Sequence, residues 1–221
     1  VWDGHMLHFR AAINESLERL GRNAADYPVD GVFTSEDYGD ELAGRLGATH
    51  ILIDKQRKWK PISATQIRCS PVEHWHAMPP EARAYLCKRI VVVGAESSGT
   101  TTLSNALQKH YAQKNGVWSN TMVVPEFGRE FTMVKYAVES ARHRLQAKQL
   151  DVADMVWTES EFEMIAKEQN SIENKLAQNS GPVLICDTDS LATCVWHERY
   201  LKSWSDAIWK IAKIAASTNS F

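Results

Sequence analysis

The chain has 221 residues, of which 44% are hydrophobic and 24% are charged, and its formal net charge is -2. This composition can build a buried core and is typical of a soluble globular protein. The small net charge gives no indication of binding to nucleic acid or to a membrane surface, and no apolar run approaches the ~20 residues that span a bilayer. The four cysteines are scattered without a CxxC pair, so we expect reduced thiols and a cytoplasmic protein.

The first part of the chain alternates between helical and strand patterns. An amphipathic helix is expected over residues 6–20, with Leu7 and Leu20 near its apolar face. Short strands are expected at 30–35 and 49–53, and the helix between them, 37–46, should end at the glycine that follows it. Strand, helix and strand in quick succession predict a parallel α/β architecture.

The second part follows a break at Met78-Pro79-Pro80 and a short helix over 81–86. Its strands are continuous apolar runs, a pattern typical of buried parallel strands. We expect strands at 89–93, 121–124 and 183–186, and helices at 101–111, 151–178 and 205–216.

A glycine-rich segment, Gly94-Ala-Glu-Ser-Ser-Gly99-Thr100-Thr101, follows the first of these strands and opens a helix. The first backbone N–H groups of a helix have no intrahelical acceptor, and the helix dipole adds partial positive charge there, so this segment predicts a phosphate-binding loop. The hydroxyl of Thr101 is expected to bind Mg²⁺. The alternative is a glycine turn without a ligand. The predicted nucleotide-binding residues are Gly94, Glu96, Ser97, Ser98, Gly99, Thr100, Thr101 and Thr102.

Thr100 stands where such loops usually carry a lysine. That lysine places a full charge against the β- and γ-phosphates, and the loss of one such group typically costs on the order of 3 kcal/mol of transition-state stabilisation. Fast phosphoryl transfer would therefore need another cation, and Arg129 or a residue beyond Phe221 are the candidates.

Acidic residues follow two of the predicted strands. Asp187 comes directly after an apolar run and should help to organise Mg²⁺, and Asp189 could face the same cleft or cap the next helix. Glu126 follows another strand and could orient or deprotonate a substrate hydroxyl, while Arg129 could contact phosphate. The alternative for Glu126 and Arg129 is a weak ion pair in a surface loop.

Together these residues resemble the bifunctional nicotinamide-nucleotide adenylyltransferase/ribosylnicotinamide kinase family, and the likeness covers nearly the whole chain. It is carried by four blocks in the same order and spacing: Ile62-Ser-Ala-Thr-Gln-Ile-Arg68, Gly94-Ala-Glu-Ser-Ser-Gly99, Glu126-Phe-Gly-Arg129-Glu130 and Asp187-Thr-Asp189.

The resemblance implies two α/β domains and two activities. Residues 1–87 would be the C-terminal part of a Rossmann-like nucleotidyltransferase domain, which joins nicotinamide mononucleotide (NMN) to ATP. Residues 88–221 would be a P-loop kinase domain with a parallel sheet, which phosphorylates nicotinamide riboside to NMN with ATP and Mg²⁺. Ser63, Thr65 and Arg68 match the motif that holds ATP phosphates in the adenylyltransferases. The chain alone leaves homo-oligomerisation open.

The chain also departs from the family. The His-x-Gly-His loop of the nucleotidyltransferases is absent, and the kinase part stops before the lid that closes over ATP, so we expect a fragment of a longer protein. Pro125 replaces an aromatic residue, and Trp157 or Trp118 would have to stack on the nicotinamide. A nucleotide-binding sensor without turnover, or a P-loop kinase of another metabolite, are the alternative functions.

Overall fold

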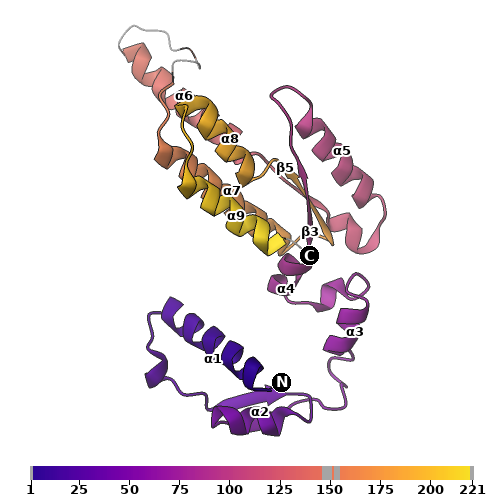
Figure 1. The fold of residues 1–221 in the computed structure, drawn as a ribbon. Helices are drawn as coiled ribbons and strands as arrows, with labels where there is room; N and C mark the ends of the chain where they lie inside the picture. Colours follow the sequence, from indigo (N-terminus) through magenta and orange to yellow (C-terminus); the bar gives the residue numbers. More distant parts are fainter. Residues whose placement is uncertain (1, 146–150, 152–154, 220–221) are drawn as a thin grey trace. The chain divides into compact units, whose positions relative to one another are not determined.

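The computed structural model describes residues 2–145, 151 and 155–219, and it divides the chain into two compact units, Val1–Ser63 and Ala64–Phe221 (Figure 1). Each unit is α/β, with parallel strands and helices packed against them. Among the described residues, none of the helices combines the length and the apolar character needed to cross a membrane.

The first unit is built around two parallel strands. Its elements are α1 (Trp2–Arg19), a 3-10 turn (Ala24–Asp26), β1 (Gly31–Thr34), α2 (Gly39–Leu46) and β2 (Thr49–Leu52). β1 and β2 pair in parallel from Gly31 opposite Thr49 to Thr34 opposite Leu52. The predicted strand–helix–strand pattern is confirmed, and Gly47 ends α2 in the left-handed conformation, with φ 72°.

The apolar face predicted for the first helix is not buried. Leu7 and Leu20 are both exposed, Leu20 lies just beyond the end of α1, and Met6 is the buried residue of α1. The pattern of apolar spacing predicted the helix but not its packing, because burial depends on what lies against the face.

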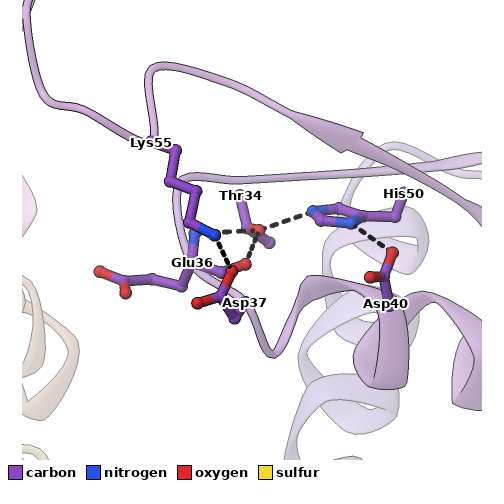
Figure 2. A network of polar contacts seen from close by, with 6 residues as sticks. All are labelled: Thr34, Glu36, Asp37, Asp40, His50 and Lys55. Carbon is purple, nitrogen blue, oxygen red and sulfur yellow. Dashed lines mark hydrogen bonds and ion pairs between the residues drawn. The ribbon is translucent and has the colours of Figure 1, made fainter.

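A polar network ties the carboxyl end of β1 to β2 and α2 (Figure 2). The Thr34 hydroxyl contacts His50 Nε2 at 2.8 Å, and His50 Nδ1 contacts Asp40 Oδ1 at 2.8 Å. Lys55 pairs with Asp37 beside them. The His50 ring packs so closely against Gly39 that a Cβ there would overlap it.

The second unit contains a three-stranded parallel sheet in the order β3–β5–β4. In chain order its elements are α3 (Ala64–Cys69), a 3-10 turn (Trp75–Ala77), α4 (Pro80–Leu86), β3 (Lys88–Val92), α5 (Thr100–Ala112), a 3-10 turn (Gly116–Asn120), β4 (Met122–Val124), α6 (Phe127–Leu145), α7 (Glu159–Ala177), β5 (Val183–Asp187), α8 (Ser190–Leu201) and α9 (Asp206–Asn219). The three strands that the sequence predicted are all present.

Alternate side chains of β5 supply the two faces of this sheet. Leu184 and Cys186 pack with α7, whereas Val183 and Ile185 pack with Leu107 and other residues of α5 and its neighbours, so the two helices cover opposite faces (Figure 1). β5 is buried throughout, as expected for a central parallel strand. β3 lies at the edge of the described sheet, and its Val91 is exposed, unlike the fully buried strand that the sequence predicted.

The segment before β3 packs onto the second unit, so the compact units divide at residue 63 and not at the predicted domain boundary after residue 87. Trp75 is 2% exposed and donates from Nε1 to the carbonyl of Ser180 at 2.9 Å. Met78 and Cys87 join the same apolar cluster. The burial of these three side chains holds residues 64–87 against the sheet, and the domain boundary after residue 87 stays a prediction.

The long helix predicted from residue 151 starts later, at Glu159. Thr158 and Glu161 form a reciprocal capping box there, which satisfies free N–H groups at the start of α7. Residues 155–158 are not helical, and 152–154 lie outside the described residues.

Candidate functional site

The glycine-rich segment lies between β3 and α5, as predicted. α5 starts at Thr100 and runs for 13 residues, and Gly99 before it has φ 90° and no side chain that could cap the helix. The first N–H groups of α5 are therefore available to an anion, and the helix dipole favours negative charge at this end.

Close packing requires a glycine at the start of this segment. A Cβ at Gly94 would lie 2.5 Å from Ser98 Oγ and 2.9 Å from Thr100 Cγ2. The chain can therefore turn back on itself here only with hydrogen in place of a side chain. Ser97 also adopts a left-handed conformation, with φ 63°.

Four of the predicted side chains form a connected polar chain beside this loop. Thr101 Oγ1 donates to Asp187 Oδ2 at 2.6 Å, and Arg129 Nη1 donates to Thr101 Oγ1 at 3.3 Å. Arg129 Nη2 also pairs with Glu126 Oε2 at 2.9 Å. Thus the loop, the end of β5 and the start of α6 bring Thr101, Asp187, Arg129 and Glu126 together.

The two predicted metal-binding residues suit Mg²⁺ chemically. Both are oxygen donors, and Asp187 is buried at the end of β5. Mg²⁺ is usually held by one or two protein oxygens together with waters and substrate phosphates. Within the described residues, no group of three or more His, Cys, Asp or Glu side chains forms a complete metal cage. The pair Thr101 and Asp187 therefore fits a metal that arrives with a phosphate ligand.

The pKa of the Glu126 carboxyl is shifted upward by its surroundings. Burial raises its pKa above the ordinary value, and the charge of Asp187 adds to this, while Arg129 opposes it. A general base works best when its pKa lies near the working pH.

A larger cavity of about 520 Å³ opens over the glycine-rich segment. Gly94, Glu96, Ser97 and Thr100 line it on the loop side, and α8 lines it on the other. Arg199 of α8 lies in this wall and approaches Glu96 at 3.5 Å. Thr102 does not line this cavity, and its side chain is exposed on α5.

A second cavity of about 260 Å³ is rich in aromatic side chains. Trp157, Phe162, Trp196 and Tyr200 line it, and the ring of Trp157 lies 5.2 Å from that of Phe162 and 5.6 Å from that of Tyr200. Of the two tryptophans predicted to stack on a substrate, Trp157 is thus in a cavity wall. Trp118 instead stacks on Tyr111 and lines neither cavity.

The two cavities share part of their walls. Glu126, Arg129, Thr188 and Asp189 belong to both, together with Glu96, Ala192 and Trp196. Glu126 and Arg129 therefore lie where a molecule in the aromatic cavity would meet a molecule at the glycine-rich loop.

Asp189 is the N-cap residue of α8. Its side chain accepts from the backbone N–H groups of Leu191 and Ala192 at 3.0 and 3.1 Å and so caps α8. This is the capping alternative that the sequence left open. The cap and the position in both cavity walls coexist, because a carboxylate has further acceptor sites.

The predicted phosphate motif of Ser63, Thr65 and Arg68 does not contribute to the walls of these cavities. Thr65 and Arg68 belong to α3, which has six residues, and Arg68 donates to Thr65 Oγ1 at 3.4 Å. Ser63 is the last residue of the first unit. None of the three lines either cavity, so their role as an ATP-phosphate site stays a prediction.

The cavity residues that the sequence analysis missed include Gln169 of α7 and Trp196 and Arg199 of α8. A signal for the last two existed, because Asp189 is a good N-cap, and positions 192, 195, 196 and 199 then share one face of the helix that follows.

Known proteins resemble this arrangement. Residues 89–218, more than half of the chain, match the family model described as AAA domain. The chain belongs to this AAA domain family. The matched range includes the glycine-rich loop, Glu126, Arg129 and Asp187.

Two curated relatives are named trifunctional NAD biosynthesis/regulator protein NadR. The protein of Salmonella typhimurium is 25% identical over 170 residues, and that of Escherichia coli is 31% identical over 103 residues. These alignments cover 76% and 46% of this chain but only 36% and 23% of the relatives. The chain thus spans about a third of their length or less.

Two solved structures share the fold. NadR in complex with NR is 21% identical with a TM-score of 0.53, and NadR in complex with NAD and AMP-PNP is 20% identical with a TM-score of 0.52. Each match covers 86% of this chain and 47% or 48% of the other. At this identity they support the α/β fold of the chain.

Proposed function

We propose that the P-loop unit is a kinase that transfers the γ-phosphoryl group of ATP to a hydroxyl of nicotinamide riboside and yields NMN. One observation carries the proposal: the cavity at the glycine-rich loop and the aromatic cavity share the walls formed by Glu126, Arg129 and Asp189. A phosphate donor and a hydroxyl acceptor can therefore meet beside a carboxylate and a guanidinium.

The loop would hold the phosphates of ATP through the free N–H groups at the start of α5. Thr101 and Asp187 would hold Mg²⁺, which neutralises phosphate charge when bound. Because Thr100 brings no charge, cations from elsewhere have to face the phosphates. Arg129 and Arg199 are the basic residues in the walls of the larger cavity, and they take that role in our proposal.

Glu126 would accept the proton of the acceptor hydroxyl as its oxygen bonds to the γ-phosphorus and ADP leaves. The raised pKa of Glu126 suits a group that takes up a proton in this step. The contact between Arg129 and Glu126 holds the carboxylate at the loop while the second guanidinium nitrogen faces Thr101.

The aromatic cavity suits the acceptor. Nicotinamide riboside carries a flat pyridinium cation, and the faces of Trp157 and its neighbours attract both flat rings and positive charge. The acidic side chains of Glu126 and Asp189 in the same wall add to this attraction. A solved NadR structure is described as a complex with NR, and another as a complex with NAD and AMP-PNP.

Residues 1–87 would belong to the NMN adenylyltransferase-like part of the same protein. Support comes from the block Ile62–Arg68 and from the parallel strand–helix–strand of the first unit. In this proposal Ser63, Thr65 and Arg68 face ATP phosphates in that second activity, as part of NAD biosynthesis in the cytoplasm.

The uncharged Thr100 favours a second candidate, a nucleotide sensor without turnover. Single-turnover mixing of the intact protein with labelled ATP, Mg²⁺ and nicotinamide riboside separates the two. Labelled NMN at a rate above the riboside-free control supports the kinase. Tight ATP binding without product supports the sensor, and product only with another nucleoside supports a kinase of a different metabolite.

A further inference from the structure

The aromatic cavity contains one buried amide that the proposed chemistry does not use. Gln169 of α7 is 2% exposed and lines this cavity. Its Oε1 accepts a hydrogen bond from the backbone N–H of Phe127 at 2.9 Å. Phe127 is the first residue of α6 and directly follows Glu126, so Gln169 fixes the backbone that carries the proposed base.

The other end of the same amide is unsatisfied. Nε2 of Gln169 is buried and makes no hydrogen bond of good geometry among the described residues, and the acceptor nearest to satisfying it is Glu173, whose pKa the amide lowers. Because Oε1 accepts from the N–H of Phe127, the positions of the amide oxygen and nitrogen cannot be exchanged. Buried polar groups are normally hydrogen-bonded, so the amide N–H that Glu173 does not take up, on a residue that lines a cavity, indicates a partner from outside the protein.

Glu173 and Arg89, which lie near Gln169, do not use both N–H donors of its amide. Burial raises the pKa of Glu173, one turn along α7, to about 7, while Arg89 and the Gln169 amide lower it. Glu173 Oε1 is likewise buried without a hydrogen bond, and Arg89 Nε lies 3.9 Å from Glu173 Oε2. A primary amide has two N–H donors, so one remains for the cavity even where the other faces Glu173.

The place of Gln169 along α7 indicates which part of an acceptor it would meet. Phe162, Ile165 and Gln169 all line the aromatic cavity from α7. Phe162 packs with Trp157 at the aromatic end, and Gln169 bonds to the residue after Glu126. Seven residues of helix span ~10 Å, which is close to the length of a nucleoside.

We propose that Gln169 is a specificity-determining residue that donates a hydrogen bond from Nε2 to an oxygen on the sugar of the acceptor, while its Oε1 positions Glu126. The proposal deepens the kinase function and depends on it. A site built around a buried donor discriminates against acceptors that lack its partner oxygen.

The test combines two variants with deoxy acceptors in the intact protein. Gln169→Glu can still accept from Phe127 N–H but lacks the amide donor, and Gln169→Met lacks both groups. We expect Gln169→Glu, assayed at pH 8, to raise KM for nicotinamide riboside at least tenfold with KM for ATP unchanged. Gln169→Met should show the same rise in KM and also a lower kcat, because α6 loses its anchor.

Substrate analogues then identify the bonded oxygen. The wild type should prefer the riboside at least tenfold over either its 2′-deoxy or its 3′-deoxy analogue, and Gln169→Glu should lose that preference for the same analogue. Gln113→Glu makes the same chemical change at an exposed site at the end of α5 and should change nothing.

The possible outcomes distinguish a failure of the proposed role of Gln169 from a failure of the proposed kinase function. An active wild type with unchanged KM and unchanged analogue preference in both Gln169 variants would overturn the role of Gln169 and leave the kinase intact. A wild type that makes no product with any acceptor would overturn both. Circular dichroism melting of each variant shows whether a loss of activity reflects unfolding.

Discussion

Each of the two units contains a polar cluster near the carboxyl end of a parallel strand, and in the second unit residues that contact the cluster also line cavities. In the first unit a threonine hydroxyl at the end of β1 contacts His50, which contacts Asp40 (Figure 2). In the second unit the Thr101 hydroxyl contacts Asp187 at the end of β5. Thr34 and Asp187 both lie at the carboxyl end of a parallel strand, where ligands of α/β proteins usually bind.

The two clusters differ in the hydrogen-bonding groups and the space that are left for a ligand. In the first unit His50 uses both ring nitrogens, Lys55 pairs with Asp37, and the side chain of Asp40 is 89% exposed. In the second unit Thr101 lies beside the free N–H groups at the start of α5, and Arg129, which contacts Thr101, lines two cavities. A polar cluster at strand ends therefore indicates a ligand site only when donors and space are left for the ligand.

The comparison is tested most strongly by removing the acid of each cluster. Asp187→Ala should lower the rate of phosphoryl transfer by ~10²–10³, because a preorganised charge that organises the phosphates is lost. Asp40→Ala, the matched change in the first unit, should leave that rate unaltered. Single-turnover assays over a Mg²⁺ titration measure both. Equal rates for Asp187→Ala and the wild type would remove the kinase site from this end of β5.

A pH experiment tests the buried acid behind the aromatic cavity. Burial raises the pKa of Glu173 from 4.5 to about 7, so its neutral form suits the folded state. The associated stability is fully present below pH ~4.5 and is lost as the pH rises through ~7, a change on the order of 3 kcal/mol. Relative to Glu173→Gln, the wild type should become less stable over this range.

Urea unfolding of both proteins at pH 4.5, 6 and 8 measures this difference. A constant gap in the free energy of unfolding across the three pH values would mean that Glu173 ionises normally in the folded protein. The opposite trend would show that the attraction of Arg89 outweighs burial.

The sequence predicted those parts of the site that lie next to one another along the chain. The apolar run, the glycines and the threonines around residue 94 predicted strand, loop and helix, and the run before Asp187 predicted an acid at a strand end. Local patterns suffice there, because backbone geometry and the order of residues fix the placement. The roles of these residues stay predictions.

Other parts of the site depend on how helices pack. Gln169 and Arg199 line cavities only because α7 and α8 turn particular faces toward the loop. The exposed Leu7 shows the converse, since apolar spacing alone did not establish what would cover it. The burial of Trp75 against residue 180 could not be predicted for the same reason, because it is a contact between distant parts of the sequence.

In the glycine-rich loop of the second unit, a substitution of Thr100 is expected to raise the rate of phosphoryl transfer. Thr100→Lys restores a cation where the γ-phosphate would lie, and it should raise the rate of phosphoryl transfer about tenfold, equivalent to ~1.4 kcal/mol. Thr102→Lys adds the same charge two residues further along α5, at an exposed position, and serves as the control. An unchanged or lower rate for Thr100→Lys would mean that Arg129 or Arg199 already supplies the missing charge.

The smallest effect on phosphoryl transfer is expected from changes in the first unit. His50→Gln should weaken the contacts to Thr34 and Asp40 and cost ~1 kcal/mol of stability, since each hydrogen bond contributes about 0.5–1.5 kcal/mol net. Phosphoryl transfer should not change, because the contacts lie wholly within the unit that lacks the loop.

A double-mutant cycle with Gly39 makes the test sharp. Gly39→Ala alone should destabilise strongly, because its Cβ would overlap the His50 ring and the Thr34 hydroxyl, and His50→Ala should relieve part of that overlap. Additive costs in the double variant would show that the ring does not occupy this position. A kinase rate that falls together with the stability of the first unit would break the comparison itself, because the polar cluster of Figure 2 would then act on the reaction and not only on the fold.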